Sequence, residues 1–195
     1  MSILHRTFAD MKRFIRWDDA PYKESRLKTP TEVELSGRAK CADAMLYLKE
    51  RLKDYYFCLP VRMLIKSDRN IGLTHRDRWV HVFMIVYDGD DLYLAEWRWC
   101  EMLSGIFGPF DSLPSLISFV ERFYLTLLRE KYKQQFWMVY APFDNPVYGC
   151  TLEEMSFGDG VFEPPPYNQF SMMLNSPDES NWKGRRMTTE LNKHE

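Results

Sequence analysis

The chain has 195 residues, a length that suits one domain of ordinary size. Its apolar fraction of 45% and aromatic fraction of 15% exclude a mainly disordered protein, because they supply enough apolar surface to form a core. The 26 basic and 28 acidic residues leave a net charge of -2, so no overall positive field attracts a phosphate backbone, and we expect no nucleic-acid partner.

The cysteines and the N-terminus indicate a cellular compartment. No CxxC pair occurs among the four cysteines, which are Cys41, Cys58, Cys100 and Cys150. The N-terminus has no secretory signal pattern, and no apolar run is long enough to span a bilayer. We therefore expect a cytoplasmic protein with free thiols and no membrane partner. Because the cysteines lack ligand spacing and histidines are few, we also expect no metal site and no cofactor.

Two helices are predicted near the N-terminus. Residues 2–17 carry one apolar stripe at helical spacing, formed by Leu4, Phe8, Met11 and Ile15. Residues 18–28 are polar and contain a proline, which predicts a connector. Thr29, Pro30 and Glu32 then have the spacing of an N-cap, a first helical residue and a capping box. A short helix should therefore begin at residue 30 and stop near Gly37.

A core-facing helix follows within residues 36–52, and Cys41 opens it. Its apolar residues repeat with the helical period and are Cys41, Ala44, Met45, Leu48 and Leu52. Its polar residues lie mostly on other faces and are Asp43, Lys49, Glu50 and Lys53. The thiol of Cys41 should thus lie at the N-terminal end of a buried stripe.

The middle of the chain predicts a sheet. Three runs rich in β-branched, aromatic and aliphatic residues are strand candidates, at 60–66, 79–87 and 91–99. The last two are separated by the sequence DGD, a strong signal for a tight turn, so they should form an antiparallel hairpin.

The C-terminal part predicts a loop, a helix, a strand and a tail. The loop contains Gly105, Gly108 and Pro109, and residues 111–132 carry the clearest helical stripe in the chain. A strand at 136–141 and a short capped helix at LEEM follow. The residues from 158 to 195 contain a triple proline and little periodic signal. We expect a single α+β domain at 1–157, with N-terminal helices, an antiparallel sheet and a packed C-terminal helix, and an extended proline-rich tail at 158–195.

The chemistry of the chain depends on a partner for Cys41. A thiol at a helix N-terminus beside an imidazole loses its proton more readily and becomes a nucleophile. His5 and His194 lie near the ends of the chain, and His75 lies in a charged loop as an alternative base. His81 instead interrupts an otherwise apolar strand, where its ring needs a polar partner. His81 is therefore the favoured base, and the alternative for Cys41 is a plain buried residue.

Glu96 is the acid that can orient His81. It is the single acid in the apolar run YLAEW, and the hairpin turn brings both residues toward the same end of neighbouring strands. Such strands lie about 4.8 Å apart, so the two side chains can meet if they share a face. The alternative partner of Glu96 is an arginine, from the set Arg62, Arg78 and Arg98.

This order of residues resembles the transglutaminase-like branch of the papain-like cysteine peptidase superfamily, and above all its small bacterial and phage proteins. The similarity covers about residues 29–125 and is carried by TPTEVELSGRAKCADAM, HVFMIVY, YLAEWRW and SGIFGPFDSL. The resemblance implies a papain-like α+β core with Cys41 as nucleophile, His81 as base and Glu96 as orienting acid. Two positions depart from the family: Ala42 replaces an often aromatic residue, and Glu96 replaces a usual aspartate.

The implied function is thiol-dependent acyl transfer on an amide of a protein or peptide substrate. Peptidase or amidase hydrolysis and transglutaminase-like transfer share one acyl-enzyme, so both stay open. The alternative is a non-catalytic binding or assembly protein, such as a phage particle component, which keeps the fold and makes contacts through the tail. The resemblance places the protein in the cytoplasm of a bacterium or a host cell, or in a virion. The second oxyanion donor beside the Cys41 N–H is open between Lys40 and the loop around Trp79.

Overall fold

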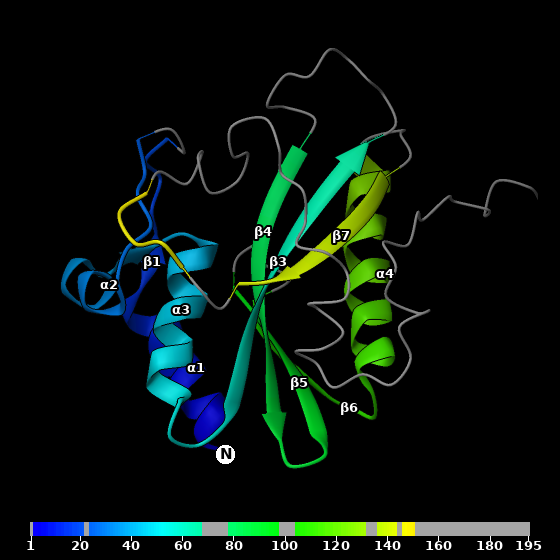
Figure 1. Cartoon of the computed structure of the whole chain (residues 1–195), viewed down its shortest axis with the longest axis horizontal. Coiled ribbons are helices and arrows are strands. Elements are labelled where there is room, and N and C mark those ends of the chain that lie inside the picture. The colour runs from blue at the N-terminus through cyan, green and yellow to red at the C-terminus, as the bar shows by residue number, and fades with distance from the viewer. Residues whose placement is uncertain are drawn as a thin grey trace, which may run out of the picture.

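The computed structural model describes residues 2–21, 24–67, 78–97, 104–131, 136–143 and 146–150. Within these ranges the chain is a mixed α+β fold, in which helices flank an antiparallel sheet (Figure 1). The general α+β prediction is therefore confirmed. The predicted helix at LEEM and the predicted tail at 158–195 lie outside the described residues.

The first helix, α1 (Ile3–Phe14), is shorter than predicted. It begins after Ser2, whose hydroxyl accepts a hydrogen bond from the backbone N–H of His5. The prediction that the helix reaches residue 17 is wrong, because Arg16–Trp17 form a strand, β1, which pairs in parallel with β2 (Arg38–Ala39). In this pairing the backbone of residues 16–17 is hydrogen-bonded to β2 instead of continuing the hydrogen-bond pattern of the helix. It also places Trp17 beside the residues that lead into the cysteine helix.

Helix α2 (Pro30–Ser36) begins and ends as the sequence predicts. The Thr29 hydroxyl accepts from the Glu32 N–H at 3.2 Å, and the Glu32 carboxylate accepts from the Thr29 N–H at 2.7 Å. This capping box satisfies donors that the first helical turn leaves open. Gly37 closes the helix in the left-handed region, with φ of 60°.

The sheet contains five described strands in the order β6-β5-β4-β3-β7, and every neighbouring pair is antiparallel. The strands are β3 (Phe57–Ser67), β4 (Arg78–Asp88), β5 (Asp91–Glu96), β6 (Gly105–Phe110) and β7 (Phe136–Pro142). The predicted hairpin is confirmed, since Asp88 pairs with Asp91 across the turn.

The prediction of a loop around Gly105 is wrong, because residues 105–110 form the edge strand β6. Its pairing with β5 includes a register irregularity between Leu92 and Leu94. Glycine and proline disfavour a central strand, but an edge strand with such an irregularity accepts them. Gly108 has φ of 121°, and a Cβ built there would lie 2.8 Å from the Leu92 carbonyl oxygen. The glycine therefore permits the close approach of the two backbones.

Two hydrophobic clusters lie on opposite faces of the sheet. Val82, Met84 and Val86 of β4 belong to the cluster that includes α1 and α3 (Cys41–Leu52). Phe83 and Ile85 belong to the cluster that includes α4 (Leu113–Lys131). The alternation follows from the two-residue period of a strand. Figure 1 shows α3 and α4 on either side of the strands, so the sheet separates the cysteine helix from the C-terminal helix.

We predict that Gly108→Ala destabilises the protein more than Gly89→Ala does. Both glycines have positive φ, but a Cβ at Gly89 would meet nothing within 4 Å, whereas at Gly108 it would meet backbone. We expect Gly108→Ala to lower the free energy of unfolding by about 2 to 4 kcal/mol, and Gly89→Ala by about 1 kcal/mol. Urea denaturation of both variants measures the difference. Equal losses would contradict the close approach at β6.

Candidate active site

Cys41 is the first residue of α3, as the sequence predicts. The first turn of the helix is fixed by Asp43, whose carboxylate accepts from the Lys40 N–H at 2.8 Å and from the Lys28 N–H at 2.9 Å. The carboxylate thus ties the connector before α2 to the start of α3. The backbone N–H groups of this turn point toward the thiol end of the helix, where their dipoles favour negative charge.

His81 and Glu96 form a buried pair on neighbouring strands. The His81 Nε2 and Glu96 Oε1 atoms are 2.7 Å apart. The pairing of β4 with β5 ends at Met84 and Ala95. His81 and Glu96 lie just beyond that last pair, at the same end of the hairpin, where their side chains meet. The predicted pairing of the two side chains is therefore found in the structure.

The thiol of Cys41 completes the cluster. Burial lowers the pKa of His81, but the charges of Glu96 and Cys41 and side-chain hydrogen bonds with both residues outweigh it and raise the pKa to about 10. Since Nε2 faces Glu96, Nδ1 is the ring nitrogen left to exchange a proton with the thiol. The structure thus brings together all three residues that the sequence singled out.

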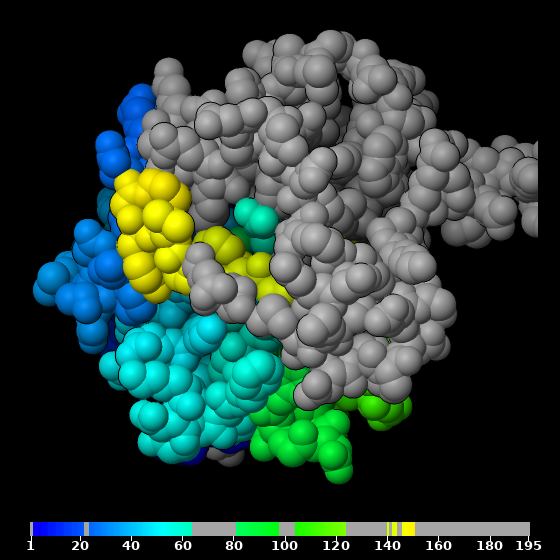
Figure 2. All heavy atoms as spheres, viewed as in Figure 1, coloured from blue at the N-terminus to red at the C-terminus, as the bar shows by residue number. Residues whose placement is uncertain are grey.

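The three side chains are buried. Cys41 is 6% exposed, His81 2% and Glu96 1%. Two indole rings lie in the same region: Trp97 follows Glu96 directly, and its ring centroid is 5.8 Å from that of Trp17. Residues 146–150 also approach this end of the molecule, because the Leu27 N–H donates to the Cys150 carbonyl oxygen at 2.9 Å. Figure 2 shows residues 146–150 in yellow against the blue N-terminal segment.

The sequence does not predict the burial of two charged residues of the site, Asp43 and Lys40. Its helical pattern favours faces other than the buried stripe for the polar residues of α3, but Asp43 is 1% exposed. Lys40 is 2% exposed, and its ammonium donates to the carbonyl oxygens of Asp18 and Ala20 at 2.6 and 2.7 Å. The available signal was the position of Asp43, three residues after Lys40, where a carboxylate can cap a helix. The backbone N–H of Lys40 is bound to Asp43, which removes it from the possible oxyanion donors.

The remaining candidates from the sequence lie elsewhere. Cys58 is buried, and burial raises the pKa of its thiol to about 12, while Cys150 is half-buried. Cys100 and His75 lie outside the described residues, as do the side chains of Arg78 and Arg98. Within the described part of the chain, no group of three or more His, Cys, Asp or Glu side chains could hold a metal ion.

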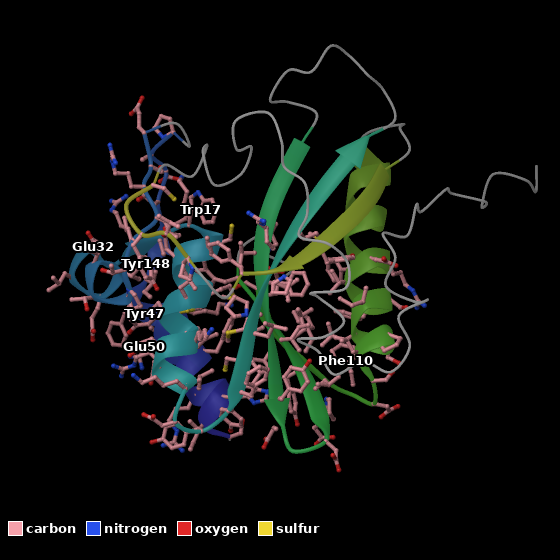
Figure 3. The ribbon with its side chains drawn as sticks, in the orientation of Figure 1. Trp17, Glu32, Tyr47, Glu50, Phe110 and Tyr148 are labelled. Carbon is pink, nitrogen blue, oxygen red and sulfur yellow. The ribbon has the colours of Figure 1, made fainter. Side chains whose placement is uncertain are left out.

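A separate groove of about 680 Å³ lies between α1, α2 and α3. Its lining is mostly polar and includes Arg6, Glu34, Tyr47, Glu50 and Arg51. Figure 3 shows Tyr47 and Glu50 on the side of α3 that faces away from the sheet. None of the three residues of the buried cluster lines this groove, so it is distinct from the thiol site.

No family model matches the chain, and no curated protein sequence matches it. Among the described residues, none of the helices has the length and apolar character needed to cross a membrane.

We predict that Asp43 is required for the structure around Cys41. Asp43→Ala leaves two backbone N–H groups without their acceptor, so we expect the free energy of unfolding to fall by about 2 to 4 kcal/mol. Asp54→Ala, which removes an exposed carboxylate just after α3, should change it by less than about 0.5 kcal/mol. Urea denaturation provides both values. A loss for Asp43→Ala as small as that of the control would show that the two hydrogen bonds do not support the fold.

We predict that His81 stays protonated in the folded protein well above its ordinary pKa of 6.5. Because the pKa is raised on folding, the stabilisation is fully present below pH 6.5 and is lost as the pH approaches 10. Removing the carboxylate charge in Glu96→Gln should lower the pKa of His81 by at least about one unit. Titration of the imidazole ¹⁵N signals by NMR measures both proteins. An unchanged His81 titration in the variant would contradict the charge coupling of the pair.

Proposed function

We propose that the protein is a thiol-dependent acyl-transfer enzyme with a papain-like core of the transglutaminase-like branch. Cys41 is the nucleophile, His81 the base and Glu96 the acid that orients the imidazole. The observation that carries the proposal is the 2.7 Å contact between His81 and Glu96, made beside a thiol at the N-terminus of a helix. A thiol, an imidazole and a carboxylate in this order have the parts needed for nucleophilic catalysis.

The reaction proceeds through an acyl-enzyme. The proton of Cys41 resides on His81 as an imidazolium, and the thiolate sulfur attacks the carbonyl carbon of an amide to form a C–S bond. As the C–N bond breaks, the leaving amine takes the proton from His81, and the acyl group remains as a thioester on Cys41. Glu96 stabilises the imidazolium during these steps. The N-terminal turn of α3 stabilises the negative oxygen of the tetrahedral intermediate.

Two acceptors can release the acyl group. Water gives hydrolysis, as in a peptidase or amidase, and a primary amine gives transfer, as in a transglutaminase. In either case the acceptor loses a proton to His81 as it attacks, and that proton returns to the departing sulfur of Cys41. The substrate class is an amide in a protein or peptide, and the protein's own residues supply the proton transfers.

A second candidate function is a binding or assembly protein without turnover, for example a component of a phage particle. The observation that favours it is the burial of the reactive groups, since Cys41 is only 6% exposed. A substrate carbonyl must reach the sulfur for the first function, whereas the second needs no access. Solvent access to the thiol therefore separates the two functions.

The test is the pH dependence of Cys41 alkylation by iodoacetamide, with each adduct located by mass spectrometry. An activated thiol should react at pH 6 at least about ten times faster than an ordinary thiol with a pKa of about 8.5. Cys150 and Cys58 are controls within the same protein, one half-buried and one buried with its pKa raised to about 12. His81→Ala should return Cys41 to the slow rate.

The outcomes separate the candidates. Fast labelling of Cys41 at pH 6 that depends on His81 supports the enzyme. Labelling of Cys41 no faster than that of Cys150 would overturn the activated nucleophile and favour the non-catalytic function. Cys41→Ser identifies the adduct peptide, because its signal should disappear.

A further inference from the structure

Lys40 is a buried cation next to the candidate nucleophile. It directly precedes Cys41, and only 2% of its surface is exposed. Lysine is rarely buried to this extent, because its ammonium loses hydration unless the protein replaces it. Here the ammonium donates to the carbonyl oxygens of Asp18 and Ala20, at 2.6 and 2.7 Å. A lysine placed this way joins the connector after β1 to the first turn of α3.

The aromatic side chains around Lys40 connect it to the rest of the site. Its Nζ atom lies 5.4 Å from the centroid of the Trp17 ring, within the range of a cation–π contact. The Trp17 ring packs against Trp97, the residue after Glu96. Figure 3 labels Trp17 near the N-terminal end of α3. The ammonium therefore lies where β1, α3 and the end of β5 meet.

The Cys41 thiol is one of the groups whose charge acts on the Lys40 ammonium. Asp18 accepts from Lys28 Nζ at 2.6 Å, and Asp43 accepts from two backbone N–H groups. Burial lowers the pKa of Lys40, and the charges of Asp18, Asp43, Cys41 and Asp19 oppose that shift. From β4, the charged group beside Cys41 is His81, which is paired with Glu96 of β5.

We propose that Lys40 is a positioning residue of the thiol site: its buried ammonium holds residues 17–20 against the first turn of α3 and stabilises the Cys41 thiolate. The inference rests on the proposed function, because a thiolate at Cys41 has a use only if the thiol is the nucleophile. His81 holds the proton of the thiol, and the Lys40 ammonium favours the negative charge left on the sulfur. A positive charge beside a thiol makes its ionisation easier.

The experiment compares the pH profile of Cys41 alkylation by iodoacetamide in the wild type and in variants of three lysines. Lys40→Met removes the charge, and its midpoint should move up by about one pH unit, which is about a tenfold slower reaction at pH 6. Lys40→Arg keeps the charge and should react within about threefold of the wild type. Lys28→Met removes the ion pair with Asp18 but keeps the Lys40 charge, so its midpoint should match the wild type. Lys53→Met is the surface control, at the opposite, C-terminal end of the same helix.

Circular dichroism and thermal unfolding establish that each variant is folded. If Lys40→Met does not fold, Lys40→Gln is measured in its place, because its side-chain amide can still donate to a carbonyl oxygen without carrying charge. A structural role alone would alter the unfolding temperature without moving the midpoint of the pH profile.

The results distinguish the two proposals. A wild-type midpoint near the ordinary value of about 8.5 overturns the proposed function and, with it, the role of Lys40. An activated wild type with an unchanged midpoint in the uncharged Lys40 variants overturns the role of Lys40 alone. An upward shift that Lys40→Arg reverses supports both.

Discussion

The contact between His81 and Glu96 is the interaction on which the candidate site depends. Both side chains are buried, and each is a hydrogen-bond partner of the other. Loss of one partner would leave a charge or an imidazole buried without its counterpart, a change that destabilises proteins strongly. The pair also fixes the imidazole ring, because Nε2 is held by the carboxylate while the ring hydrogen-bonds with Cys41.

Buried charged side chains with hydrogen-bond partners also hold the N-terminus of α3. The Asp43 carboxylate accepts from two backbone N–H groups, and the Lys40 ammonium donates to two backbone carbonyl oxygens. Two side chains of opposite charge, one before and one after Cys41 in the chain, therefore hold the connector at residues 18–28 against the start of α3. These contacts use hydrogen bonds from charged groups, which are stronger than neutral ones. The thiol is therefore held in place by its neighbours in the chain as well as by the sheet beneath α3.

The sheet supplies the rigidity that such a site needs. One face packs on α1 and α3 and the other on α4, so β4 and β5 are held from both sides. The thiol comes from a helix and the two partners come from neighbouring strands, which are more constrained than loops. The same burial that orders the three side chains limits access to the sulfur, and access is the property on which the two proposed functions differ.

The sequence by itself determined the helices and central strands, because their apolar residues repeat with the period of each element. It also determined the candidate triad, because His81 and Glu96 are lone polar residues in apolar strands and Cys41 begins an amphipathic helix. Only the tertiary structure decided that residues 16–17 and 105–110 are strands, because each pairs with a segment that its local sequence does not specify. The burial of Asp43 and Lys40 was likewise decided by folding: their hydrogen-bond partners, Lys28, Asp18 and Ala20, lie 15 to 22 residues away in the chain.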